Sequence, residues 1–201
     1  MANEELWRRL VGLDGHETAR RAKCIYVEDP PSYTLTLLNK EYAVEPGERS
    51  IVCRGDSSRP DYARRLCILA YLINAKDLPV VGKLAPAELL RQGEFFFRGP
   101  HELGTDKLVG AFGEAPQRLY AAGEKFGATK AEYGDAAVRF YVLPRVPLHV
   151  VLWRADEEFE ARASVLFDET AAEQLPLDAL WMAVVVTIKE LVKGSRKAAG
   201  P

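Results

Sequence analysis

Apolar and polar residues alternate with a period of two in the first third of the chain. In residues 33–38, aromatic or aliphatic side chains alternate with threonine. This pattern predicts a strand, because successive side chains of a strand point to opposite faces of a sheet. Asn39 and Lys40 suit a turn into a return strand over residues 41–44, although the turn lacks the favoured glycine. A short strand over residues 51–53 completes this region.

Three further apolar stretches are separated by connections that are too short to hold a helix. Residues 136–143, 148–154 and 161–167 each predict a strand, and only residues 144–147 and 155–159 lie between them. A crossover between parallel strands needs a dozen or more residues. The three strands must therefore run antiparallel as a contiguous meander.

Helical spacing of apolar residues marks most of the remaining chain. The clearest helix covers residues 58–75, with Ser58 as its cap and Asp61 in its first turn. Its face of Leu66, Leu69 and Ile73 is expected to pack on the sheet. The last segment contains a β-branched run, but its apolar stripe and its capping residues favour a helix. The other expected helices cover residues 4–23 with a break at 12–15, 87–91 as one turn, 106–112, 116–125 and 177–192.

These elements predict the α+β class. We expect a single domain over residues 1–193, built on an antiparallel sheet with a C-terminal three-strand meander and packed by several helices. Residues 194–201 are small and basic without periodicity, which predicts a disordered tail. A chain of 201 residues can bury roughly 70% of its unfolded surface, so it needs no disulfide or metal to fold.

Charge and composition exclude several classes of partner. The net charge of −2 and the pI of about 6.0 disfavour nucleic-acid binding through a broad basic face. No apolar run approaches the ~20 residues of a membrane span, and the N-terminus is not a secretory signal, so we expect a cytoplasmic protein. Cys24, Cys53 and Cys67 are scattered, which predicts free thiols and no metal site.

The segment of residues 93–101 is the first candidate site. It contains three adjacent phenylalanines, then Arg98, a Gly-Pro turn and His101. Arginine has a planar donor fork suited to carboxylate or phosphate, and histidine titrates near neutral pH. One interpretation is a buried aromatic strand followed by an exposed turn. The other is a ligand site that uses Phe96, Arg98 and His101.

The second candidate segment is the connection of residues 143–147, in which two prolines flank Arg145. This stiff connection could hold Arg145 towards a ligand, or it could simply resist edge pairing. We expect Arg98, His101 and Arg145 to converge on one concave region that binds an anion. The competing explanation is a structural ion pair with an acidic neighbour such as Glu94, Glu102 or Asp135.

Other polar features have simpler explanations. His149 is expected to be a packed sheet residue, and Cys67 a small core residue. Residues 156–158 are acidic and could bind a hard cation, but a polar hairpin tip explains them equally well. The arginine pairs at 8–9, 20–21 and 64–65 are expected on solvated helix faces.

The chain resembles a prokaryotic family known only as a domain of unknown function, found mostly in anaerobic bacteria and archaea. The resemblance is carried by residues 95–101, 143–148, 152–153, 156–159, 166–168 and 175–176. Some members of that family are described as iron–sulfur proteins with extra cysteine-rich segments. This chain has three scattered cysteines instead of clustered ligands, so we expect no iron–sulfur cluster in it.

Three functions stay open from the sequence. The first is a protein that binds a small anionic molecule, or an accessory protein, in anaerobic redox or one-carbon metabolism; the pathway rests on the resemblance alone. The second is an enzyme that uses His101 as acid or base and Arg98 with Arg145 as an anion clamp; no other cofactor or catalytic residue is indicated. The third is a structural partner of another subunit, or a homodimer. Nucleic acid and membrane are not expected partners.

Overall fold

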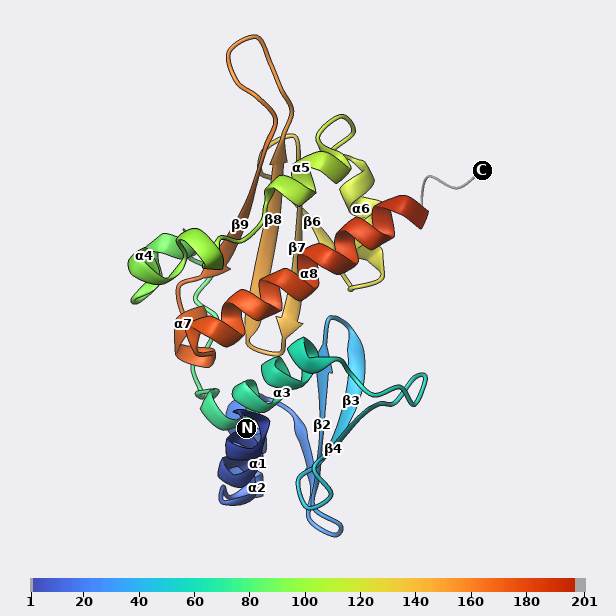
Figure 1. Cartoon of the computed structure of the whole chain (residues 1–201), viewed down its shortest axis with the longest axis vertical. Helices are drawn as coiled ribbons and strands as arrows, with labels where there is room; N and C mark the ends of the chain where they lie inside the picture. Colours follow the sequence, from blue (N-terminus) through green and yellow to red (C-terminus); the bar gives the residue numbers. More distant parts are fainter. Residues whose placement is uncertain (1, 198–201) are drawn as a thin grey trace.

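The chain folds into helices and two antiparallel sheets (Figure 1). The computed structural model describes the backbone of residues 2–197 and the side chains of residues 4–195. The α+β class is confirmed, but the expectation of one sheet is wrong. The N-terminal strands pair only with one another, and they meet the second sheet where the Leu38 N–H donates to the Val142 carbonyl at 3.0 Å.

The first sheet has four strands in sequence order, and one of its faces is buried. Tyr33 and Leu35 lie on this face beside Val44 and Tyr42 of the neighbouring strand. The alternation of apolar residues with threonine over residues 33–37 is what made the first of these central strands predictable. The strands are β1 (Ile25–Val27), β2 (Ser32–Leu37), β3 (Lys40–Glu45) and β4 (Ser50–Cys53).

The turn between β2 and β3 lies one residue earlier than expected, at Leu38 and Asn39. Both residues have left-handed φ angles, 49° and 60°, as in the tight turns that usually contain glycine. Leu38 is buried and its N–H is bonded to Val142, so contact with the second sheet holds the strained turn. This contact could not be deduced from the local sequence.

The second sheet has the strand order β5-β9-β8-β7-β6 and contains the predicted meander. In β7 and β8, Phe140 pairs with Leu148, and in β8 and β9, Leu148 pairs with Phe167. The antiparallel meander is therefore confirmed. The two outer strands have three residues each and were not predicted. The strands are β5 (Leu84–Pro86), β6 (Thr129–Ala131), β7 (Ala136–Leu143), β8 (Val146–Trp153) and β9 (Arg162–Asp168).

Helices cover one face of the second sheet, and the longest of them, α8, runs diagonally across it (Figure 1). Helices α5 and α6 pack on the same strands and on α8, while α3 packs on α8 from the other side. The helices are α1 (Ala2–Val11), α2 (Gly15–Ala22), α3 (Tyr62–Asn74), α4 (Gly93–Phe96), α5 (Asp106–Phe112), α6 (Arg118–Glu124), α7 (Ala171–Gln174) and α8 (Leu177–Lys197), with short 3-10 turns η1 (Ala87–Leu89) and η2 (Gly99–His101).

Helix α3 starts later than expected and packs on different neighbours. Asp61 is the N-cap and accepts a hydrogen bond from the Arg64 N–H, whereas Ser58 bonds to Asp56. The buried face of α3 contacts α1 and α8 more than the sheet, because α8 already covers the sheet at this point. Leu69 is fully buried in this contact, and Leu66 is only half-buried.

Two of the arginines expected on solvated faces are half-buried. Arg64 joins α3 to α8, because its guanidinium bonds to both Asp61 and Glu190 at 2.6 Å. Arg21 on α2 bonds to the Ala75 carbonyl at the end of α3. The helical pattern showed which residues lie on helices, but it did not show that other elements cover them.

Phe95 and Phe96 of the first candidate segment lie in a helical turn and Phe97 is its C-cap, so the expectation of an aromatic strand is wrong. The turn α4 follows Gln92, which has a left-handed φ of 64°. Consecutive residues of a helix point roughly 100° apart. This spacing lets Phe97 be buried and Phe96 half-buried while Phe95 is left exposed.

Helix α8 continues past the expected start of a tail at residue 194. Gly194 and Ser195 are helical and buried, and the Ser195 carbonyl accepts a hydrogen bond from Arg118 of α6 at 2.8 Å. The expectation of disorder is therefore wrong for residues 194–197, because α6 packs on this last turn. Residues 198–201 lie outside the described part of the chain.

Within residues 2–197, no helix combines the length and the apolarity needed to cross a membrane.

We expect Leu69→Ala to lower the free energy of unfolding by ~2–5 kcal/mol, because it leaves a cavity where α3 meets its neighbours. Urea denaturation followed by circular dichroism measures the loss. The matched control is Leu89→Ala at an exposed leucine, which should change stability by less than about 0.5 kcal/mol. A loss below about 1 kcal/mol for Leu69→Ala would contradict the packing described here.

Candidate functional site

Two of the four predicted site residues, Phe96 and His101, lie against each other. Their rings stack with centroids 4.3 Å apart and planes 19° apart. His101 also meets the edge of Trp181 on α8 at 5.3 Å, and the Trp181 indole N–H donates to the Glu102 carbonyl at 3.1 Å. These contacts anchor α4 and η2 on the N-terminal part of α8.

Arg98 is the most exposed of the predicted site residues. Its side chain is 65% exposed, and its closest acidic partner is Glu94, four residues earlier, at 3.7 Å. An exposed pair of this kind contributes little to stability. Arg98 is therefore free to meet a ligand, but no element of the fold orients it.

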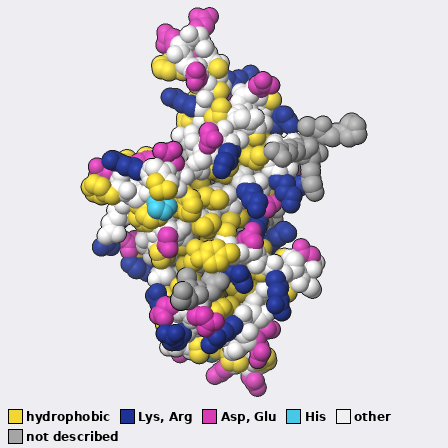
Figure 2. All heavy atoms as spheres, in the orientation of Figure 1, with side chains coloured by type: hydrophobic (Ala, Val, Ile, Leu, Met, Phe, Trp, Pro, Cys, Tyr) yellow, Lys and Arg dark blue, Asp and Glu magenta, His cyan; other side chains and the backbone are white. Residues whose placement is uncertain are grey.

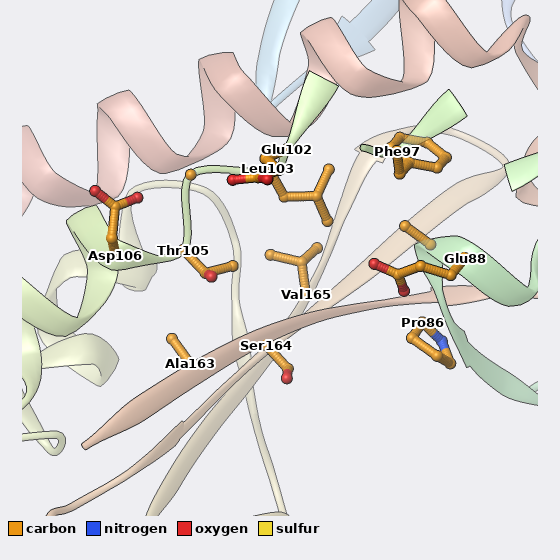
Figure 3. A pocket seen from close by; sticks show the side chains of 12 residues that line it. Pro86, Glu88, Phe97, Glu102, Leu103, Thr105, Asp106, Ala163, Ser164 and Val165 are labelled. Carbon is orange, nitrogen blue, oxygen red and sulfur yellow. The ribbon is translucent and has the colours of Figure 1, made fainter. Parts of the chain in front are cut away.

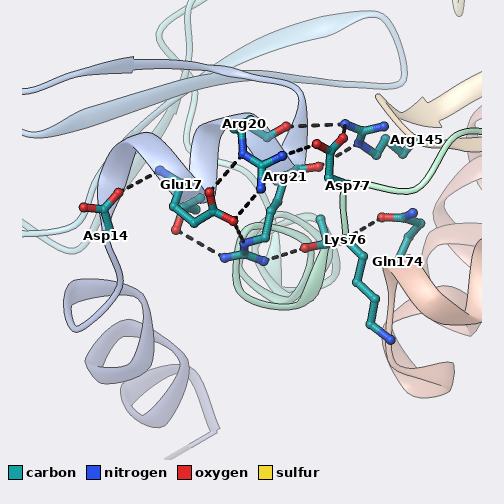
Figure 4. Close-up of polar contacts among 10 residues, drawn as sticks. Asp14, Glu17, Arg20, Arg21, Lys76, Asp77, Arg145 and Gln174 are labelled. Carbon is teal, nitrogen blue, oxygen red and sulfur yellow. Dashed lines mark hydrogen bonds and ion pairs between the residues drawn. The ribbon is translucent and has the colours of Figure 1, made fainter.

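Arg145 is held by the chain itself (Figure 4). Its Nε donates to the Arg21 carbonyl at 2.7 Å and its Nη1 to the Leu78 carbonyl at 3.1 Å. Its Nη2 is paired with Asp77, and the side chain is only 14% exposed. Arg145 thus fastens the β7–β8 turn to the C-terminal end of α2, where helix carbonyls lack partners.

The acidic neighbour of Arg145 is thus Asp77, which the sequence analysis did not consider. Glu94 pairs with Arg98, while the Asp135 carboxylate accepts from the Arg154 N–H. Arg98 and Arg145 contact different residues, so these contacts do not support a shared anion clamp. The convergence of the two arginines stays a prediction.

A pocket of about 340 Å³ lies beside the first candidate segment (Figure 3). Phe97 contributes to its wall, and β9 forms one side of it. Three carboxylates, Glu88, Glu102 and Asp106, line the pocket. This charge is unfavourable for an anion, so the pocket does not suit the ligand class that the sequence suggests.

A second pocket, of about 150 Å³, lies on the face of the second sheet that is not covered by helices. Alternation along β7 and β8 directs Phe140 and Leu148 to the helices and sends Arg139 and His149 to this outer face. Arg139 and His149 are direct cross-strand partners. The remaining lining residues are Val80, Gly82, Leu84, Tyr133, Pro147 and Asp168.

His149 is the most unusual residue of this outer-face pocket. It is only 8% exposed, and its Nδ1 atom is buried without a hydrogen-bond partner. Burial lowers the pKa of His149, and the nearby charge of Arg139 lowers it further, so the imidazole is neutral at pH 7. The Tyr133 ring meets the imidazole edge-on at 6.0 Å. A buried polar atom without a partner typically costs about 1–3 kcal/mol.

Asp168 is the acidic residue of the outer-face pocket, and its hydrogen-bonding capacity is already used. Its carboxylate accepts from the Gly82 N–H at 2.6 Å and from the Thr170 hydroxyl at 2.6 Å. Burial alone would raise the pKa of Asp168, but the bonds from Thr170, Gly82 and Val81 outweigh burial and lower the pKa. Asp168 thus joins the start of β5 to the end of β9 and is satisfied without a ligand.

Arg139 supplies a positive charge that no carboxylate neutralises directly among the described side chains. Its Nη2 donates to the Tyr141 hydroxyl at 2.6 Å, and its guanidinium carbon lies 5.1 Å from the Tyr141 ring centre. The remaining donors of the guanidinium are left for solvent or a ligand. A neutral imidazole and an arginine without an acidic partner among the described side chains therefore lie side by side in the lining of a small pocket.

The acidic tip of residues 156–158 supplies its own hydrogen bonds. The Asp156 carboxylate accepts from the N–H groups of Glu158 and Phe159 at 2.9 and 2.7 Å. These bonds lower the pKa of Asp156. They favour the interpretation of a polar hairpin tip over a cation site.

The three cysteines lie apart, as free thiols. Burial raises the pKa of Cys24 and of Cys67 to about 12, so neither is a reactive thiolate at neutral pH. Among the described residues, no group of three or more His, Cys, Asp or Glu side chains is placed to hold a metal ion.

We expect Arg145→Ala to lower the free energy of unfolding by about 1–3 kcal/mol, because it leaves carbonyl groups of α2 without donors. Arg98→Ala is the matched control and should change stability by less than about 0.5 kcal/mol. Urea denaturation of both variants measures the difference. Equal stability of the two variants would show that Arg145 is not a structural residue.

The lowered pKa of His149 predicts a loss of stability in mild acid. The unfolded histidine titrates near 6.5 and the folded one at lower pH, so the unfolded state binds more protons between these values. Stability should be complete above about pH 6.5 and should fall as the pH drops below it. Urea midpoints between pH 7.5 and 5.5 measure this fall.

His149→Gln should have a weaker pH dependence than the wild type over this range. His16→Gln, at an exposed histidine, should leave the wild-type dependence unchanged. If the wild type and His149→Gln show the same dependence, the imidazole is not buried in its neutral form.

Comparison with known proteins identifies the family of this chain but no characterised relative. No curated protein matches the chain, and no solved structure does. A family model described as "Domain of unknown function (DUF3786)" matches residues 14–190, which include both sheets, all of the outer-face pocket and most of α8. The chain therefore belongs to the DUF3786 family.

Proposed function

We propose that this protein binds a small oxyanion, a carboxylate or a phosphate, in the outer-face pocket. The observation that carries the proposal is the buried His149 imidazole, whose Nδ1 has no partner, opposite the Arg139 guanidinium. The volume of about 150 Å³ suits a ligand no larger than benzene. The ligand class is the one expected from the sequence, but the site is different.

Four of the lining residues have a role in this proposal. Arg139 donates charge-assisted hydrogen bonds to the anion, and such bonds are roughly twice as strong as neutral ones. His149 donates one further hydrogen bond. The Tyr133 ring, which meets the imidazole edge-on, limits the access of water to the bound anion. Asp168 repels the anion only weakly, since four donors already surround its carboxylate.

A binding role agrees better with these contacts than an enzymatic one. His101, the expected acid or base, is packed between the aromatic rings of Phe96 and Trp181. Among the described residues, no hydrogen bond joins His101 or His149 to a nucleophile. The link to anaerobic redox or one-carbon metabolism stays a prediction that rests on the resemblance.

Isothermal titration with acetate and with inorganic phosphate tests the proposal. We expect the wild type to bind at least one of the two, and more tightly at pH 6 than at pH 8. The reason is linkage: an anion that favours the protonated imidazole must bind better when protons are available. Comparing the two probes separates a preference for carboxylate from a preference for phosphate.

Arg139→Gln and His149→Gln should each weaken binding by about tenfold or more, the effect of losing a charged or buried hydrogen bond. The control is Arg162→Gln. Arg162 lies on β9 outside the pocket lining and packs over the Trp153 ring at 4.7 Å. Arg98→Gln tests the earlier candidate segment. Equal affinity in all five proteins would refute the outer-face site, and a loss confined to Arg98→Gln would return the site to the α4–η2 segment.

A further inference from the structure

Helix α8 is apolar on the arc that faces solvent as well as on the arc that faces the core. Its buried arc includes Leu180, Val184 and Leu191. Its outward arc carries Met182, Val185 and Val192, which are only half-buried. Figure 2 shows the resulting band of hydrophobic side chains across the middle of the molecule. Apolar side chains on the outward arc of a surface helix are typical of a face that binds another molecule.

A groove of about 480 Å³ runs along this outward arc. Val185, Ile188 and Val192 of α8 and Leu103 of the η2–α5 connection form its apolar lining. Three lysines surround it, Lys189 and Lys193 on α8 and Lys107 on α5. No salt bridge joins these lysines to a carboxylate among the described side chains. An apolar groove of this kind marks a surface that another molecule covers.

The opposite end of the same arc is acidic. Asp178 is exposed, and it lies seven residues before Val185, which places it on the same face of the helix. Glu102 is also exposed and lies beside Trp181, one turn further along. The arc therefore has an acidic end, an apolar centre at Val185 and a basic end at Lys189 and Lys193.

We propose that a second copy of this chain covers the groove, with the two α8 helices packed antiparallel about a two-fold axis near Val185. In a two-fold interface the same surface contributes from both sides, so the surface must complement itself when reversed. Here the reversal places Asp178 of each copy beside Lys193 of the other. It also places Met182 of each copy over the groove lining at Ile188.

The charge pattern alone has a simpler explanation, but the apolar centre does not. Acidic residues at the start of a helix and basic residues at its end also complement the helix dipole. The dipole gives no reason for the half-buried apolar side chains of Met182 and Val185 between them. A purely acidic partner would pair with the lysines and be repelled by Asp178, so the second copy fits the whole arc better.

Sedimentation equilibrium of the full chain tests the proposal. The wild type should be a dimer, and Val185→Glu should raise the dimer dissociation constant by about a hundredfold or more, since it places two unpaired carboxylates at the centre of the interface. Leu89→Glu, at an exposed leucine away from α8, is the control and should remain dimeric. A monomeric wild type, or a Val185→Glu variant as dimeric as the control, would overturn the proposal.

Charge reversal tests the antiparallel arrangement. Asp178→Lys alone and Lys193→Glu alone should each weaken the dimer, because each brings like charges together. The double variant should restore it, because the pair reforms with opposite signs. Failure of the double variant to recover, in a protein whose circular dichroism matches the wild type, would rule out this pairing.

Discussion

The packing of α8 against the helix-covered face of the second sheet is the contact on which the rest of the structure depends. Ala179, Leu180, Ala183 and Val184 are fully buried in it. On one side α3 packs against α8 and brings the first sheet with it, and on the other side α5 and α6 pack against the same helix. One continuous hydrophobic core therefore runs through both sheets, although they share little backbone hydrogen bonding.

This arrangement leaves the two sides of the second sheet in different environments. The inner face is filled by apolar side chains from the helices. On the outer face, Val80 and Gly82 of the chain before β5 and Tyr133 of the β6–β7 loop lie beside His149 in the pocket lining. A polar pair such as Arg139 and His149 can exist there, because one side is still open to a ligand or to water. Arg145, by contrast, lies at the turn of the same hairpin, and its guanidinium donors already bond to groups that join the sheet to α2.

The sequence was sufficient for elements with a long, regular pattern. The short connections at 144–147 and 155–159 predicted the antiparallel meander. The capping residues and the apolar spacing of α8 predicted a helix in spite of its β-branched run. The sequence was insufficient for elements whose structure depends on contacts with residues far away in the chain. The strands β5 and β6 have three residues each, which is too short to show the period-two pattern of a strand. The helical turn at Phe95–Phe97 depends on the left-handed Gln92 and on burial of Phe97 by other elements.

The candidate site likewise combines features that the sequence predicts with features that only the folded chain shows. The pairing of β7 with β8 followed from their short connection, but the register did not. A β-bulge between Tyr141 and Leu143 shifts the pairing by one residue, and this shift places Arg139 opposite His149. Tyr133 and the N–H groups around Asp168 come from segments with no periodic pattern, and only the folded chain shows them beside His149. Arg145 was singled out for its stiff surroundings, but it serves the fold. The carbonyl groups of Arg21 and Leu78, which come from two other segments, accept its hydrogen bonds.

The central claim is that His149 is a neutral imidazole whose Nδ1 has no hydrogen-bond partner in the free protein, and that it binds an anion. The direct measurement is the pKa of His149 from the NMR shifts of its ring, with and without acetate or phosphate. The account predicts a pKa below 6.5 in the free protein and a rise when the anion is added. A pKa at or above 6.5 that neither anion changes would contradict it.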